Sequence, residues 1–124
     1  MNSNNAVFLK RLEKLQKAFL DSCDQRGVLI EREYQLVLRA RDATERIESL
    51  QRIRDEVHKL AGSSGAYGFS TLGQAAFELE RCCSTLLARD DGSVDASLGA
   101  LTALINEVLL RIRQAQLISQ VSTD

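Results

Sequence analysis

The sequence predicts an all-α fold, a single bundle of antiparallel helices. The chain has 124 residues, no proline, and only 5% aromatic residues, whereas β-sandwiches are usually richer in both proline and aromatic residues. Apolar residues make up 44% of the chain, and they recur at intervals of three and four, which is the spacing of one helix face. A chain of this length is expected to form one domain.

Two helices are expected in the first third of the chain, after a flexible tail over residues 1–6. The first helix is predicted over 7–24, and its apolar stripe consists of Phe8, Leu12, Leu15, Phe19 and Cys23. Gly27 marks its expected end. A second helix is predicted over 28–40, with apolar side chains at Ile30, Tyr34, Val37 and Leu38.

A third helix is predicted over residues 43–65. Asp42 comes directly before this helix and Glu45 lies in its first turn, which is the spacing of a capping box. Its stripe consists of Ile47, Leu50, Ile53, Val57, Leu60 and Ser64. The sequence leaves open whether the chain turns or only bends near Arg41.

The fourth helix opens at Ser70 or Thr71, the latter with Gln74 three residues on, and continues to about Ala88. Its stripe consists of Leu72, Ala76, Leu79, Cys83 and Leu86.

A last helix is predicted over 95–117, after a loop at 90–93 and before a second flexible tail over 119–124. Its stripe consists of Leu98, Leu101, Ile105, Val108 or Leu109, and Ile112. Helices that are apolar on one side can bury their stripes only against one another. Residues 7–118 are therefore expected to form one antiparallel bundle of four or five helices.

The charge and hydropathy patterns exclude several classes of protein. The 16 basic and 17 acidic side chains give a net charge of −1, which offers no broad attraction to nucleic acid or anionic lipid. The most apolar stretch, 98–110, is shorter than the roughly 18 residues of a membrane span, and the N-terminus has no signal-peptide pattern. We expect a cytoplasmic protein that neither binds nucleic acid nor inserts into a membrane.

The sequence predicts no cofactor and no metal. The chain has one histidine, so an HExxH zinc motif is impossible. The glycines that follow this histidine do not form a Walker motif, which needs GxxxxGK after a strand. The cysteines lack CxxC spacing and are expected to be reduced thiols on helices: Cys23, Cys82 and Cys83.

The single histidine, His58, is the candidate reactive group. It projects roughly 120° away from the apolar stripe of its helix and should face solvent. The residues one and two turns later are small: Ala61, Gly62 and Gly65. Two glycines and two serines here sacrifice about 2 kcal/mol of helix propensity, which suggests a surface kept open for a partner. Alternatively, the glycines allow close helix packing or end the helix.

The run HKLAGSSGAYGF, residues 58–69, resembles the signature of the histidine-containing phosphotransfer (Hpt) domain family. In that signature a glycine follows the histidine at the fourth position, and a glycine and an apolar residue follow from the tenth. Here these are Gly62, Gly68 and Phe69. The resemblance is specific over about 54–80 and architectural elsewhere. It implies a four-helix bundle, often with an additional N-terminal helix, in which His58 is phosphorylated.

The resemblance also implies the partners of His58. The family places a carboxylate or amide 22 residues after the histidine, at Glu80 here, where it accepts a hydrogen bond from the imidazole and orients the ring. The chain departs from the family at Ala61, where a lysine is common. Lys59 and Arg54 could supply the missing charge, because phosphoryl transfer needs nearby cations.

A family member of this kind is a phosphoryl carrier in a two-component phosphorelay and not an enzyme, with no ATP site and no kinase motif. Its partners are receiver domains of response regulators or hybrid histidine kinases, and a receiver would bring its own Mg²⁺. The docking face is expected to comprise Ala61, Gly62 and Gly65, with Tyr67 and Phe69 at its edge. We expect a monomer.

Three other interpretations of the sequence remain open. The chain could be a bundle of the same descent that docks a receiver or regulates an output domain without transferring phosphate, as the alanine at 61 suggests. It could be a structural or interaction bundle in which His58 is incidental. It could also be a metal or thiol enzyme built on Cys82 and Cys83.

Overall fold

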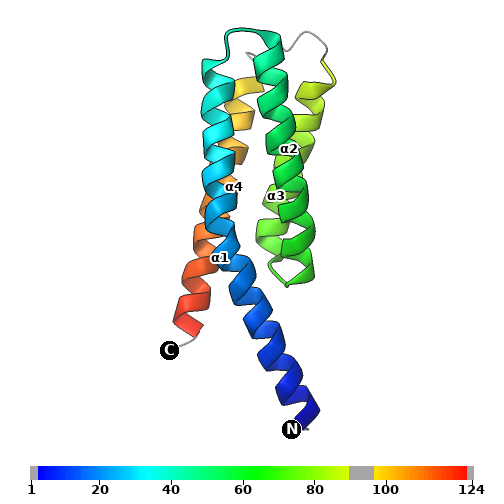
Figure 1. The fold of residues 1–124 in the computed structure, drawn as a ribbon, viewed down its shortest axis with the longest axis vertical. Helices are drawn as coiled ribbons and strands as arrows, with labels where there is room; N and C mark the ends of the chain where they lie inside the picture. Colours follow the sequence, from blue (N-terminus) through cyan, green and yellow to red (C-terminus); the bar gives the residue numbers. More distant parts are fainter. Residues whose placement is uncertain (1–2, 90–96, 123–124) are drawn as a thin grey trace.

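The computed structural model describes residues 3–89 and 97–122, which form four helices and no strand (Figure 1). The helices are α1 (Ser3–Arg39), α2 (Ala43–Ala66), α3 (Ser70–Leu87) and α4 (Leu98–Ser122). Helices α1 and α3 each pack against both α2 and α4. The predicted antiparallel four-helix bundle is confirmed.

The predicted additional N-terminal helix is not a separate element, because α1 is one continuous helix of 37 residues. The predicted end at Gly27 is wrong. This glycine keeps a negative φ, and a Cβ placed on it would lie 3.5 Å from Cδ2 of Leu109 in α4. Packing of α1 against α4 therefore offsets the roughly 1 kcal/mol by which a glycine disfavours a helix.

Both ends of the fold differ from the expected tails. Helix α1 begins at Ser3, and α4 continues to Ser122. The first turns of α1 extend past the end of the bundle (Figure 1), so two residues of the predicted stripe are largely exposed, Phe8 at 64% and Leu15 at 52%. The loop expected at 90–93 lies outside the described residues.

The turn between α1 and α2 reverses the chain direction (Figure 1), which answers the question that the sequence left open near Arg41. The Asp42 side chain accepts a hydrogen bond from the Glu45 N–H at 2.9 Å, and the Glu45 carboxylate accepts one from the Arg41 N–H at 2.9 Å. The predicted cap is thus present. In a standard capping box the Glu45 carboxylate would accept from the N–H of the N-cap, Asp42. Here it accepts from the N–H of Arg41, the residue before the N-cap.

The turn between α2 and α3 depends on Gly68, whose φ of +85° is the only positive φ among the described residues. Such a backbone conformation strongly favours glycine. The Phe69 N–H then donates to the Ser64 carbonyl at 2.8 Å, and α3 begins at Ser70. Phe69 is the N-cap and no side chain caps the helix, so Thr71 and Gln74 do not form a capping box.

The core contains the central stripes of all four helices. Val108, and not Leu109, completes the stripe of α4. The largest fully buried side chains are Cys23, Ile30, Leu50, Ile53, Val57, Leu60, Leu72, Leu79, Leu86, Leu101, Ile105 and Val108. No helix in the described part of the chain is both long and apolar enough to span a membrane.

Candidate functional site

His58 lies on α2, on the side away from the core, and 73% of its side chain is exposed. The residues one position before and two positions after it, Val57 and Leu60, are fully buried. The amphipathic pattern of α2 therefore fixes the direction of the imidazole, as its offset from the apolar stripe indicates.

The imidazole is held from one side by α3. Its Nδ1 lies 2.6 Å from Oε2 of Glu80, the distance of a strong, charge-assisted hydrogen bond. A carboxylate can only accept, so Nδ1 is the donor and carries the proton. In this tautomer Nε2 keeps its lone pair, and Nε2 has no hydrogen-bond partner among the described residues.

Gly73 explains how α3 comes close enough for this contact. A Cβ placed on it would lie 3.4 Å from Cβ of Ser64 and 3.5 Å from the Ala61 carbonyl oxygen, so α3 crosses α2 closely here. Gly73 and Glu80 are seven residues apart and share one face of α3. Sequence reasoning missed this residue, although a glycine inside an amphipathic stripe often marks a close approach.

Gly62 and Gly65 have a different environment. Apart from the chain neighbours and the backbone of α2 itself, no described atom lies within 4 Å of a Cβ placed on either glycine, and both are exposed. They therefore do not serve close packing of α2 against a neighbouring helix, which removes that alternative for these two positions. Because glycine has no side chain, these two positions leave the surface of α2 open from one turn after His58 onwards.

The other residues expected on the docking face are partly used inside the fold. Ala61 packs against the core. Tyr67 and Phe69 place their ring centroids 5.4 and 5.8 Å from that of Phe19 in α1. These two aromatic residues fasten the α2–α3 turn to α1, and both are half-buried.

The two candidate cations differ in their surroundings. Lys59 is exposed. Arg54 lies one turn before His58, where its guanidinium is 3.4 Å from the Asp55 carboxylate. Burial, with a contribution from neighbouring Cys82, raises the pKa of the Cys83 thiol to about 12, whereas the Arg54 charge opposes this rise. Arg54 and His58 are four residues apart and therefore lie on one side of α2.

Phe77 is a further residue beside the site that sequence reasoning did not single out. It lies on α3 three residues before Glu80, is 46% exposed, and has the Arg81 guanidinium 5.9 Å from its ring centroid. The sequence feature that could have identified Phe77 is its position outside the apolar stripe of α3, where a large apolar side chain is left exposed. An aromatic residue there is a common anchor for a protein partner.

The cysteines offer no reactive centre. All three are free, and burial raises the pKa of Cys23 to about 11 and that of Cys83 to about 12. Burial also raises the pKa of Cys82. A thiol with a raised pKa is a poor nucleophile and metal ligand near neutral pH.

The fold and the site together define a helical bundle whose chemistry centres on one exposed imidazole held by a carboxylate. The family model of the Hpt domain matches residues 10–117, and the chain belongs to this family. Neither a curated protein nor a solved structure matches the chain. At the level of the family, Hpt domains take part in histidine phosphotransfer in phosphorelays, as carriers that interact with receiver domains.

Proposed function

We propose that this protein is a phosphorelay intermediate that accepts a phosphoryl group on His58 from one receiver domain and donates it to another. The observation that supports this most directly is the 2.6 Å hydrogen bond between Nδ1 of His58 and Glu80, on an imidazole that is 73% exposed. This arrangement supports a ring with its proton on Nδ1 and an accessible nucleophilic nitrogen at Nε2.

In the proposed step, the Nε2 lone pair attacks the phosphorus of a receiver's aspartyl phosphate. The N–P bond forms, the P–O bond to the aspartate breaks, and the aspartate leaves as a carboxylate. The ring acquires positive charge, which the Glu80 carboxylate stabilises through Nδ1–H. Donation to the next receiver reverses these changes, so the same geometry serves both directions.

Charge around the phosphoryl group would come from both partners. We assign Lys59 and Arg54 as the cations of this chain, since one is exposed beside His58 and the other lies one turn before it. The receiver brings its divalent cation in its own acidic pocket. Ala61 leaves this chain with one cation fewer than the family commonly has.

The docking face of the proposal is the surface around His58. Gly62 and Gly65 leave room for the receiver, Ala61 lies beside them, and Phe77 provides exposed apolar area on α3. Tyr67 and Phe69 form the edge of this face near the α2–α3 turn. A small face of this kind suits the transient complexes of signalling.

The test is transfer from phosphorylated receivers. The protein is incubated with a panel of receivers carrying a labelled aspartyl phosphate, and the product is then treated with acid or alkali. We expect an acid-labile, alkali-stable label, which indicates phosphohistidine, and none in His58→Gln. Label that persists in this variant, or that resists acid, would contradict the proposal.

A docking module without transfer is the second candidate, and the alanine at position 61 favours it. Such a module would bind a receiver with the same face but would acquire no label from any donor. Receiver binding measured beside transfer therefore separates the two candidates.

A further inference from the structure

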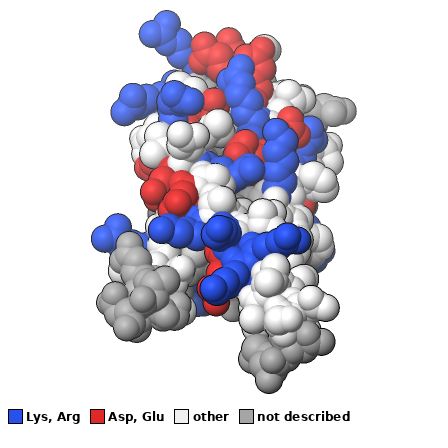
Figure 2. All heavy atoms as spheres, turned by 60° about the horizontal axis from the view of Figure 1, so that its bottom comes forward, with Lys and Arg blue, Asp and Glu red and all other residues white. Residues whose placement is uncertain are grey.

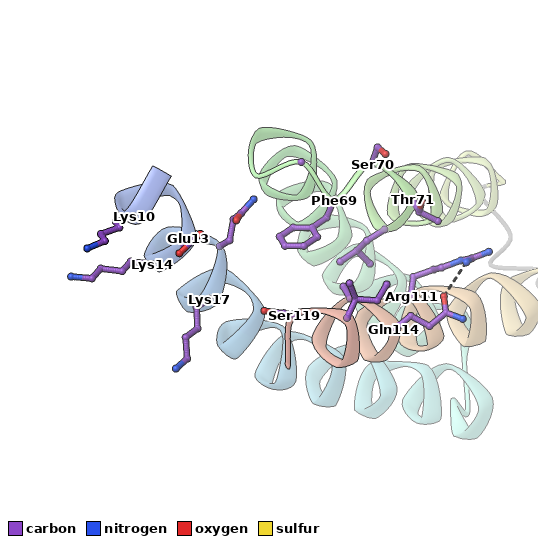
Figure 3. Close-up of a pocket in the computed structure, with 15 residues that line it drawn as sticks. Lys10, Glu13, Lys14, Lys17, Phe69, Ser70, Thr71, Arg111, Gln114 and Ser119 are labelled. Carbon is purple, nitrogen blue, oxygen red and sulfur yellow. Dashed lines mark hydrogen bonds between the residues drawn. The ribbon is translucent and has the colours of Figure 1, made fainter. Parts of the chain in front are cut away.

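A second feature lies at the end of the bundle where the N-terminal part of α1 and the C-terminal part of α4 diverge (Figure 1). A groove of about 950 Å³ opens there, lined by α1, the start of α3 and the end of α4 (Figure 3). No residue of α2 lines it. The groove thus lies away from His58, although it shares Phe69 with the edge of the proposed docking face.

The α1 wall of the groove is basic. Lys10, Lys14 and Lys17 line its outer edge at helical spacing, with their side chains directed away from Phe69 (Figure 3), and Glu13 is the one acidic lining residue. These three lysines form no hydrogen bond or ion pair with any residue in 3–89 or 97–122. Figure 2, which turns this end of the molecule forward, shows Lys and Arg side chains gathered between the two chain ends.

The α4 wall of the groove contributes less unpaired positive charge than the α1 wall. Arg111 of α4 lines the groove, but it is bound to the Glu107 carboxylate at 2.6 Å and to Gln114 at 3.0 Å. The lysines therefore dominate the charge of the groove, although the whole chain has a net charge of −1. Like charges four residues apart on a helix repel each other, and Glu13 is the one acidic residue lining the groove beside Lys10 and Lys14.

The floor of the groove is apolar. Phe69, Leu72, Ala115 and Ile118 line it, and Ile118 is 70% exposed. A small anion would neutralise lysines but would leave these side chains in water. A ligand that satisfies both surfaces has an apolar face beside acidic groups.

We propose that this groove binds an acidic amphipathic helix from a partner protein. Its apolar face would cover Phe69 and Ile118, and its acidic residues would face the lysines of α1, whose i, i+4, i+7 spacing another helix can match. A second copy of this chain is a poor occupant, because its own lysine-bearing end repels this one. A flat anionic bilayer does not fill a groove between two helices.

The groove contains none of the residues proposed to react in phosphotransfer, and it shares Phe69 with the edge of the docking face. Gly68, at its edge, follows His58 by ten residues, or about 15 Å along a helix. A bound helix in the groove would cover Phe69, at the edge of the proposed docking face, but would leave His58 and Glu80 uncovered, so each proposal is tested by its own assay. Failure of one proposal would not affect the other.

The probe is a synthetic helical peptide with leucine on one face and glutamate flanking it, titrated with the whole protein by fluorescence anisotropy at low and physiological salt. We expect saturable binding that weakens with salt. The triple variant Lys10→Glu, Lys14→Glu, Lys17→Glu should weaken it at least about tenfold, as should Ile118→Ser. The matched control is Arg32→Glu, Arg39→Glu, Arg41→Glu, which reverses three exposed charges outside the groove and should change nothing.

A peptide with lysine in place of glutamate tests the chemistry without changing the protein, and it should not bind. Equal affinity for both peptides, equal affinity of the two triple variants, or no binding of the acidic peptide would overturn the proposal. So would lysine-dependent binding to phosphatidylserine vesicles or to DNA in the absence of peptide binding.

Discussion

The imidazole of His58 and the carboxylate of Glu80 are 22 residues apart in the chain and 2.6 Å apart in space. The hairpin of α2 and α3 produces this proximity. Gly68 closes the turn with its positive φ, and Gly73 lets α3 approach α2 closely. The register of one hairpin therefore sets the geometry of the candidate nucleophile.

Replacing His58 should remove function without disturbing the fold. The side chain is 73% exposed, so His58→Gln should change the free energy of unfolding by less than about 0.5 kcal/mol while abolishing labelling by phosphorylated receivers. Thermal unfolding and the transfer assay measure the two quantities. A loss of several kcal/mol would show that the side chain supports the fold.

Adding bulk at Gly62 should block the partner. Gly62→Arg replaces an exposed helical glycine that has no neighbour within 4 Å, so stability should hold or rise by up to about 1 kcal/mol. Transfer should fall at least about tenfold, because the receiver can no longer reach the reacting geometry. Gly62→Ala is the matched control, and it should gain stability and retain transfer. A stability loss with intact receiver binding would assign this glycine to packing.

Removing the orienting carboxylate should slow the chemistry selectively. Glu80→Ala removes the acceptor from Nδ1–H, and single-turnover transfer should slow by roughly tenfold or more. Receiver affinity should barely change, since Glu80 acts through His58. A change in affinity with an unchanged rate would instead place Glu80 in the docking contact.

Restoring a cation at position 61 should help an active carrier. Ala61→Lys places a positive charge three residues after His58, where it can stabilise the phosphoryl group. The rate of transfer or the lifetime of the phosphohistidine should increase. If wild type and variant both remain unlabelled while the receiver binds, the chain is a docking module.

Enlarging Gly73 should separate α3 from α2. Gly73→Val adds a branched side chain at a position where the Cβ alone would lie 3.4 Å from Cβ of Ser64, so we expect a loss of about 1–3 kcal/mol. Transfer should slow, and nitrogen NMR of the His58 ring should show a weakened Nδ1–H hydrogen bond. Gly65→Val, at an open helical position, should not destabilise the fold. An unchanged ring spectrum in Gly73→Val would show that Gly73 does not position the pair.

The sequence by itself determined the features that arise from short-range forces. The stripes of α2, α3 and α4 follow from helical periodicity, and the cap at Asp42 needs only neighbouring residues. The outward direction of His58 follows from the same periodicity, because buried Val57 and Leu60 fix the rotation of α2. These features involve residues within one or two turns of each other, where local patterns carry most of the information.

Tertiary structure decided the features that depend on contacts between helices. Gly27 should have ended a helix on local propensity, yet α1 continues because it packs against Leu109 of α4. Tyr67 and Phe69 pack their rings against Phe19 of α1. Phe8 belongs to the apolar stripe of α1 but is exposed, because the first turns of α1 extend beyond the other helices (Figure 1). Such contacts join distant parts of the chain, and packing energies there exceed the roughly 1 kcal/mol differences of local propensity.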